Sequence, residues 1–259
     1  MAIYNITSEQ LKGQGILNSF EIAAGGASFT NTYSVQFDGS DDYIKTDATY
    51  SVLDGGTKAS FSVWLKPDSG APTLEYVLSN PRDSSGNNGQ FGLVLYEGNS
   101  VTFFVQSRTA QKVQAGIGNI TYGSWNHILV TIDLALSAGN EAKIYINGVD
   151  RTTSSAMGTL GSFYTATDRL YIGEEANGAF NPYDGKMDEL AIWAGTTLTS
   201  GDASTLYNSG VPTDLSQFST PPTNWWRFEE GSGTTISDSI GSADATIVNQ
   251  TSFVEDVPS

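Results

Sequence analysis

The stretch QFGLVLYEGNSVTFFVQS, residues 90–107, contains two strand-like segments separated by a short turn. Both segments are rich in Val, Leu and Phe, and β-branched and aromatic side chains suit the pleated, half-buried surface of a sheet. The intervening segment, Tyr96 to Ser100, contains the glycine expected of a hairpin loop. This stretch therefore predicts an antiparallel β-hairpin.

Segments of the same kind recur along the chain, with turn dipeptides such as Asp-Gly and Asn-Gly between them. They read YSVQF (33–37), SFSVWLK (60–66), EYVLS (75–79), HILVTID (127–133), AKIYIN (142–147) and RLYIG (169–173). Many short strands with regular turn signals predict an all-β fold, an antiparallel β-sandwich of the jelly-roll type.

One short helix is predicted, over residues 200–208. Ser200 can cap its start, Asp202 suits its first turn, and Gly210 lies just beyond its end. The helix would close the sandwich domain, for which we predict residues 33–212.

Three further segments surround this domain. Residues 1–32 are predicted to form an N-terminal arm, and residues 213–224, with Pro221-Pro222, a linker. Residues 225–259 are predicted to form a C-terminal strand pair. This pair either completes its own sandwich or docks onto a neighbouring subunit, because a strand behind a flexible linker can be exchanged.

The charge balance excludes several classes of partner. Lys and Arg number 12 against 28 Asp and Glu, which gives a net charge of −16, and this charge repels nucleic acid.

The sequence also lacks several other features. Because it contains no cysteine, disulfides and thiolate metal sites are excluded. The chain contains no apolar run of about 18 residues, so the sequence predicts no membrane-spanning segment. The N-terminal residues lack the features of a secretory signal, so we expect folding in the cytoplasm where the chain is made.

Six blocks in a fixed order resemble the laminin G-like, pentraxin-related branch of the concanavalin A-like lectin/glucanase superfamily. They are VQFDGSDDYI (35–44), FSVWLKP (61–67), SWNHILVTID (124–133), KIYINGV (143–149), GKMDELAIW (185–193) and LTSGDASTLYNSG (198–210). The resemblance implies the same jelly-roll sandwich.

The last block, WWRFEEGSGTTISDSIGSADATIVN (225–249), follows the helix, whereas a similar block precedes the FDG motif in many relatives. With the chain's ending, it resembles lectin-like proteins of tailed phages. That resemblance implies a non-enzymatic virion structural protein, a capsid decoration protein or a tail or appendage module, whose partners are other virion proteins or copies of itself. The resemblance thus implies a location in the virion, and it would explain the missing secretory signal, because phage proteins leave the cell by lysis. The alternative is a calcium-dependent carbohydrate-binding adhesin for host surface glycans, and a glucanase-like hydrolase ranks third.

Hydrolysis of glycans requires two carboxylates facing each other across a cleft, and the E-x-D-x-x-E run of related glucanases is absent. Asp188 and Glu189 are adjacent, so a regular strand would point them to opposite faces. The one histidine, His127, is expected to be a packed structural imidazole. We therefore predict no catalytic residues.

A structural calcium ion is a further expectation. Met187 and Leu190 break the period of two in GKMDELAIW, so an extra residue at Asp188-Glu189 implies a β-bulge that can turn a carboxylate inward. An inward carboxylate must be paired or bound to metal. The family resemblance implies Ca²⁺ at Asp38 and Asp188. Alternatively, Asp188 accepts backbone N–H bonds without metal.

Glycan binding is expected at two loops that carry aromatic and amide side chains, PRDSSGNNGQ (81–90) and EEANGAFNPYDG (174–185). The candidate ligand-binding residues are Arg82, Asn87, Asn88, Asn177, Phe180, Asn181 and Tyr183. The alternative is ordinary turn chemistry, with the two aromatic rings packed at the domain edge. Of the adjacent Trp225 and Trp226, at most one is expected to be buried by its own sheet.

Overall fold

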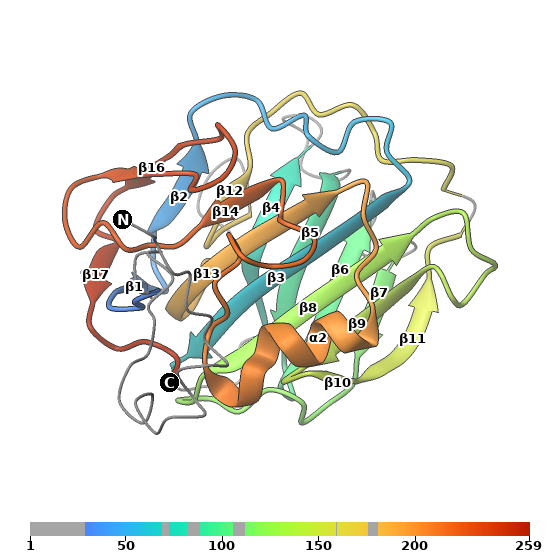
Figure 1. Ribbon diagram of the computed structural model, residues 1–259, viewed down its shortest axis with the longest axis horizontal. Helices are drawn as coiled ribbons and strands as arrows, with labels where there is room; N and C mark the ends of the chain where they lie inside the picture. Colours follow the sequence, from blue (N-terminus) through green and yellow to red (C-terminus); the bar gives the residue numbers. More distant parts are fainter. Residues whose placement is uncertain (1–28, 69–72, 82–88, 106–111, 159, 176–180) are drawn as a thin grey trace, which may run out of the picture. The chain divides into compact units, whose positions relative to one another are not determined.

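The computed structural model describes residues 29–68, 73–81, 89–105, 112–158, 160–175 and 181–259 (Figure 1). The chain divides into two compact units, Met1–Thr30 and Asn31–Ser259, and the second unit contains all the strands described below. These strands form two antiparallel sheets, and within the described residues one short α-helix lies outside them. The predicted all-β sandwich is confirmed.

The first sheet has eight strands in the order β10-β9-β8-β3-β13-β1-β17, and β14 also pairs with β13. Its strands are β1 (Ser34–Asp38), β3 (Lys58–Pro67), β8 (Asn126–Asp133), β9 (Ala142–Ile146), β10 (Val149–Asp150), β13 (Asp184–Ala194), β14 (Asn224–Trp226) and β17 (Ser252–Val254). Strands β3 and β13 lie at its centre and pair along most of their length.

The second sheet has nine strands in the order β11-β7-β6-β5-β4-β12-β2-β16-β15. Its strands are β2 (Tyr43–Thr46), β4 (Leu74–Pro81), β5 (Gly89–Tyr96), β6 (Ser100–Val105), β7 (Lys112–Ala115), β11 (Thr152–Ala156), β12 (Tyr171–Ile172), β15 (Thr235–Ile236) and β16 (Ala245–Val248). The predicted hairpin is β5 and β6, in which Tyr96 pairs with Ser100.

Apolar side chains from the facing sides of the two sheets form one core. Phe61 of β3 lies 4.9 Å from Phe91 and 4.7 Å from Phe103, measured between ring centroids. Phe91 and Phe103 come from the hairpin of the second sheet, where side chains alternate between core and exterior. The three aromatic rings therefore join the two sheets.

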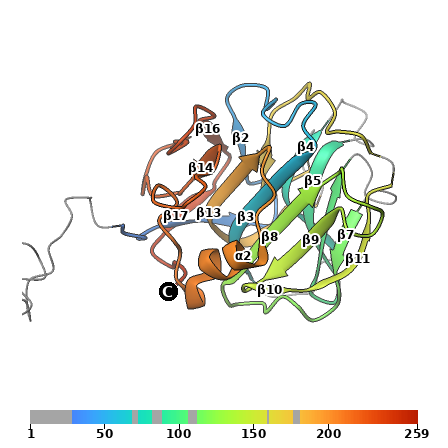
Figure 2. The same cartoon turned by 45° about the vertical axis from the view of Figure 1, so that its right-hand side comes forward.

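The C-terminal segment contributes strands to both sheets of its own chain. Strand β14 pairs with Leu190–Ile192 of β13, β17 pairs with β1, and β16 pairs with β2. In Figures 1 and 2 these strands lie together at one side of the sandwich. Both tryptophans of β14 are buried, Trp226 in the core and Trp225 on the opposite face.

We expected the sheet itself to bury at most one of these tryptophans. Trp226 lies in the core, and side chains on the outer face cover Trp225. Its Nε1 donates to Glu189 Oε2, and the Arg227 guanidinium lies 5.1 Å from its ring centroid.

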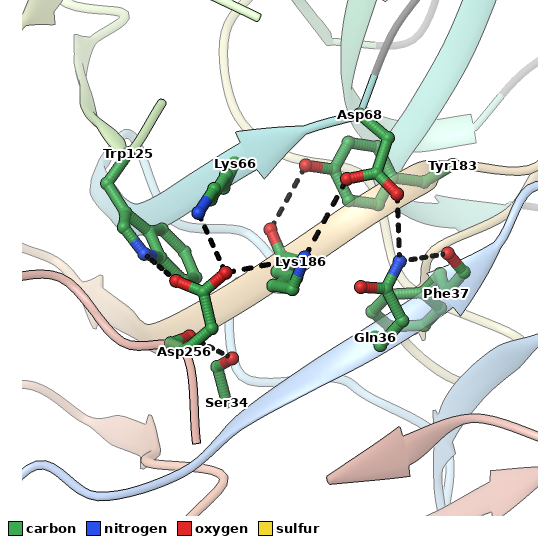
Figure 3. Close-up of polar contacts among 9 residues, drawn as sticks. All are labelled: Ser34, Gln36, Phe37, Lys66, Asp68, Trp125, Tyr183, Lys186 and Asp256. Atoms are coloured by element: carbon green, nitrogen blue, oxygen red, sulfur yellow. Dashed lines mark hydrogen bonds and ion pairs between the residues drawn. The ribbon is translucent and has the colours of Figure 1, made fainter. Parts of the chain in front are cut away.

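A polar network holds the chain's C-terminal residues against the outer side of the eight-stranded sheet (Figure 3). Asp256 accepts hydrogen bonds from Lys66 Nζ at 2.7 Å and Trp125 Nε1 at 3.1 Å, and Lys186 Nζ lies 3.5 Å away. The Ser34 hydroxyl donates to the Asp256 carbonyl. Although partial burial opposes ionisation, these donors and cations hold the pKa of the Asp256 carboxyl below its usual value.

Helix α2 (Ser200–Tyr207) lies across the eight-stranded sheet (Figure 1), and its Tyr207 ring stacks on Trp64. Thr199, rather than the predicted Ser200, is its N-cap and forms a capping box with Asp202. Within the described part of the chain, no helix is long and apolar enough to cross a membrane.

Residues 213–224, predicted as a linker, pack onto the sandwich. Leu215 and Phe218 are buried, and the Thr220 carbonyl accepts a hydrogen bond from Trp193 Nε1. This segment is therefore part of the domain.

Replacing Trp226 by alanine tests the role of the C-terminal strands. Because its ring is fully buried in the core, Trp226→Ala is expected to lower the free energy of unfolding by about 3–5 kcal/mol, measured by urea denaturation. The control, Tyr207→Ala, removes a partly exposed ring of helix α2 that stacks on Trp64, and it should cost less than half as much. Equal losses would contradict this assignment.

Candidate functional site

A row of side chains crosses the outer face of the nine-stranded sheet. Strand registers align, in order, Lys45, Tyr171, Ser79, Gly92, Phe104 and Lys112. The residues beside them in each strand, such as Ile44 and Phe103, face the core. Neighbouring strands lie about 4.8 Å apart. In this row a lysine therefore lies at each end, and aromatic rings lie between the two lysines.

The middle of this row is closely packed. A Cβ atom on Gly92 would collide with Phe104 Cζ, so only glycine leaves room for this ring. Phe104 packs edge-on against Tyr76, with 6.3 Å between the ring centroids. Ser79 and Phe104 are only 5% and 6% exposed, so the accessible surface lies towards the two ends of the row.

At one end, a shallow depression of about 650 Å³ lies beside the β5–β6 turn. It is lined by Tyr96, Glu97, Gly98, Ser100, Lys112, Gln114 and Ile117. The Ile117 side chain is 81% exposed. An aromatic ring, an exposed aliphatic side chain, an amide and two charged groups thus share one surface, which we call the hairpin depression.

Backbone hydrogen bonds fix the rim of the hairpin depression. Gly118 N donates to the Gly98 carbonyl at 2.7 Å, and Ile120 N donates to the Asn99 carbonyl at 3.2 Å. The Asn99 side chain donates back to the Ile120 carbonyl. Asn99 and Gly98 both have positive φ angles, of 60° and 73°, which suit asparagine and glycine in a tight turn.

The polar floor of the hairpin depression comes from β7. Gln114 Nε2 donates to Thr102 Oγ1 at 3.1 Å, which orients the amide group. Lys112 forms no ion pair within the described residues, so its ammonium group is available to a ligand.

A second aromatic patch lies towards the other end of the row. The rings of Tyr43 and Tyr171 lie 6.0 Å apart, and Lys45 Nζ lies 5.7 Å from the Tyr43 ring centroid. The Tyr171 hydroxyl donates to Asp168 Oδ1. Burial, with Asp168 next in effect, raises the pKa of Tyr171 to about 12, so this phenol remains a neutral hydrogen-bond donor at physiological pH.

Only part of the predicted ligand-binding set can be placed. Asn181 lies beside the nine-stranded sheet, where its carbonyl accepts from Tyr76 N and its amide donates to Glu175. The prediction for Tyr183 is wrong: its side chain is fully buried in the core, and its hydroxyl donates to the Lys186 carbonyl. Arg82, Asn87, Asn88, Asn177 and Phe180 lie outside the described residues.

The structure does not bring Asp38 and Asp188 together, so a calcium site that they share is wrong. Asp38 pairs with Asp184, and Asp188 lies four residues further along β13. At about 3.3 Å per residue, this separates them by about 13 Å, too far for one ion. The carboxylates of Asp38, Asp41 and Asp42 instead lie within 4.8 Å of one another. Their closeness in the sequence, within one turn, could have predicted this cluster.

The predicted β-bulge is confirmed. The register between β13 and β3 shifts between Asp188 and Ala191, and Glu189 has a positive φ of 50°. Met187 and Leu190 both belong to the core. The bulge leaves both Asp188 and Glu189 outside the hydrophobic core, yet both carboxylates are buried, with exposed fractions of 0% and 3%. Asp188 is paired, because its Oδ2 accepts a hydrogen bond from Asn31 Nδ2 at 2.8 Å.

His127 is buried, as expected of a structural imidazole. Its Nε2 lies 2.8 Å from Ser62 Oγ, and its ring centroid lies 5.0 Å from that of Trp64. Burial lowers the pKa of His127 to about 3, so the ring is neutral at physiological pH.

Glu75 of β4 is a buried carboxyl group at one end of the sandwich, 9% exposed. Burial, with the nearby carboxylates of Asp184 and Asp68, raises its pKa from 4.5 to about 7. Its Oε2 has no hydrogen-bond partner among the described residues. Ionised Glu75 is therefore destabilising.

Because the pKa of Glu75 is higher in the folded than in the unfolded chain, its contribution to stability is fully present below pH 4.5 and is lost as the pH rises through about 7. Glu75→Gln should remove roughly 3 kcal/mol of this pH dependence, measured by urea unfolding at pH 4 and pH 8. Glu97→Gln, at an exposed position, is the control. An unchanged pH dependence in Glu75→Gln would refute the assignment.

Comparisons with known proteins place this fold. The model of the concanavalin A-like lectin/glucanases superfamily, in its laminin G form, matches residues 38–203. The chain belongs to this superfamily. No curated protein sequence matched the chain.

Solved structures with this superfamily fold resemble the chain at low sequence identity. A Bacteroides ovatus protein described as carbohydrate binding is 15% identical, with a TM-score of 0.65, over 89% of this chain and 62% of its own. The chain thus spans less than two thirds of that protein. The heptameric SAP-like pentraxin of Limulus polyphemus is 17% identical, with a TM-score of 0.55, over 85% and 96%.

A third structure is the CBM40 domain of a Ruminococcus gnavus sialidase bound to α2,3-sialyllactose. It is 11% identical, with a TM-score of 0.50, over 67% of this chain and 96% of its own. At these identities, all three similarities show the fold alone.

Proposed function

We propose that this protein is a non-enzymatic carbohydrate-binding module that holds a glycan in the hairpin depression. The observation that carries this proposal is the lining of that depression, where the Tyr96 ring lies among Lys112, Gln114 and Ile117. Ligand sites typically combine apolar surface with a few placed polar groups.

Each side chain suits a part of a sugar. The C–H face of a pyranose can pack on the Tyr96 ring and the exposed Ile117 side chain. The Gln114 amide and the Lys112 ammonium can donate to hydroxyl groups, and Glu97 can accept from them. Because the rim is held by backbone hydrogen bonds, little ordering is needed on binding.

The similar structures support this assignment, because the Bacteroides ovatus protein is described as carbohydrate binding and the Ruminococcus gnavus domain holds sialyllactose. The proposed module is a lectin-like binding protein, and the depression, rather than calcium, carries the contact with the sugar.

A glycan array with the full chain tests the proposal. Wild-type protein should bind a defined class of sugars, and Tyr96→Ala should weaken binding to that class by about 10-fold or more, because the stacking surface is lost. The matched control is Tyr43→Ala, which removes another tyrosine from the same face on strand β2. If no sugar binds, the proposed function fails; if Tyr43→Ala alone weakens binding, the site lies at the other patch.

We further propose that the module is displayed on a phage virion and that its N-terminal residues attach it to other virion proteins or copies of itself. Support comes from the WWRF block and from the division of the chain at Thr30. Deleting residues 1–28 should abolish self-association while leaving the sandwich folded. Light scattering and circular dichroism would measure the two effects, and an unchanged oligomeric state would contradict attachment through this segment.

A further inference from the structure

A cavity of about 190 Å³ lies on the eight-stranded sheet, whereas the hairpin depression belongs to the other sheet. Side chains at the ends of β8 and β9 form its floor, and the loop between these strands and the residues that precede helix α2 form its walls. We call it the β8–β9 cavity. Its lining includes Thr131, Asp133, Leu136, Glu141, Tyr145 and Leu198.

The alternation of side chains along β8 and β9 sets the floor of this cavity. Ile132 pairs with Ala142, and both side chains belong to the core, so the residues next to them in each strand face outward. Asp133 N donates to the Glu141 carbonyl at 2.7 Å, which continues the pairing by one residue. The carboxylates of Asp133 and Glu141 therefore stand side by side on the outer face, where the two strands end.

Hydrogen bonds to the sheet fix one wall. Thr197 Oγ1 donates to the Ile132 carbonyl at 2.7 Å, and Leu198 N donates to Ser60 Oγ at 2.9 Å. The Leu198 side chain gives this wall an apolar surface. At the rim, Leu136 is 51% exposed, so an apolar group already faces solvent beside the two carboxylates.

The charges around the β8–β9 cavity do not balance. Lys58 Nζ lies 3.0 Å from Asp133 Oδ2, and Lys143 Nζ lies 3.0 Å from Asp150 Oδ2. Glu141 takes part in no ion pair within the described residues, although it is only 3% exposed and accepts one backbone N–H group. Because a buried charge without a counter-charge is costly, this carboxylate favours a cationic partner.

We infer that the β8–β9 cavity receives an arginine or lysine side chain of a partner protein. Such a side chain carries its charge on an apolar stem, so the charged group can meet Glu141 while the stem packs against Leu136 and Leu198. The cavity is smaller than the roughly 300–1,000 Å³ of a small-molecule pocket, as suits a single side chain. The net charge of −16 also attracts basic protein surfaces.

An NMR titration of the full, ¹⁵N-labelled chain with the peptide acetyl-glycyl-arginyl-glycine amide tests the inference. The peptide should bind with a Kd on the order of 1 mM and shift the amide signals of residues 131–145 and 197–198. The matched peptide with citrulline in place of arginine has the same shape without the charge. It should bind about 10-fold more weakly or less tightly still, because the charge-assisted contact with Glu141 is lost.

Glu141→Gln should weaken binding of the arginine peptide by about 10-fold or more. The control, Glu255→Gln, makes the same change at an exposed position and should leave the Kd unchanged. If Glu141→Gln does not fold, Leu136→Ala carries the test, and it should weaken binding about threefold because part of the apolar rim is lost.

The inference is overturned if the arginine peptide shifts no signals around the cavity, if the citrulline peptide binds equally well, or if Glu141→Gln or Leu136→Ala keeps the full affinity. Spermine distinguishes a free cation from a protein side chain. If spermine binds in the cavity more than about 10-fold more tightly than the peptide, the ligand is a polyamine and docking of a partner protein is refuted. None of these outcomes affects the glycan proposal, which concerns the other sheet.

Discussion

Strand β13 is the element on which the rest of the structure depends, because it bonds to three other strands. One edge pairs with β3. The other edge is divided: β1 pairs with Asp184–Met187, and β14 pairs with Leu190–Ile192. The bulge at Asp188-Glu189 separates the two halves. Without β14, the backbone groups of the second half would form an open sheet edge, which explains why the domain needs its C-terminal segment.

The same constraint ties the two ends of the described domain to one another. Strand β1 pairs with β13 on one side and with β17 on the other, and Asp256 is held by Lys66 and Lys186. Glu229 binds the backbone that leads into β1. The first and last strands of the domain therefore stabilise each other, and each is held by residues that are distant in the sequence.

The two outer faces differ in how they use their few cations. On the eight-stranded sheet, five cations take part in ion pairs with the domain's own carboxylates: Lys58, Lys66, Lys143, Lys186 and Arg227. Lys45 and Lys112, on the nine-stranded sheet, form no ion pair within the described residues and lie beside aromatic rings. The net charge of the chain is −16, so lysines without an acidic partner are notable. On the nine-stranded sheet these lysines lie beside tyrosine rings, as suits the proposed binding surface, whereas the cations of the eight-stranded sheet stabilise the domain itself.

Local patterns in the sequence predicted most of the longer strands, the β5–β6 hairpin, the short helix and the bulge of β13, because each depends on side-chain alternation, turn residues or capping groups within a few positions. The short strands β2, β7 and β11 were not among the predicted segments. The tertiary structure alone decided which distant residues meet. Tyr183 looked like a loop residue but is in the core, and Asp38 and Asp188 are separated by strand register. The hairpin depression joins β5, β6 and β7 with Ile117, and Asp188 meets Asn31 from 157 positions away. Register and sheet order set these contacts, and neither can be read from a single segment.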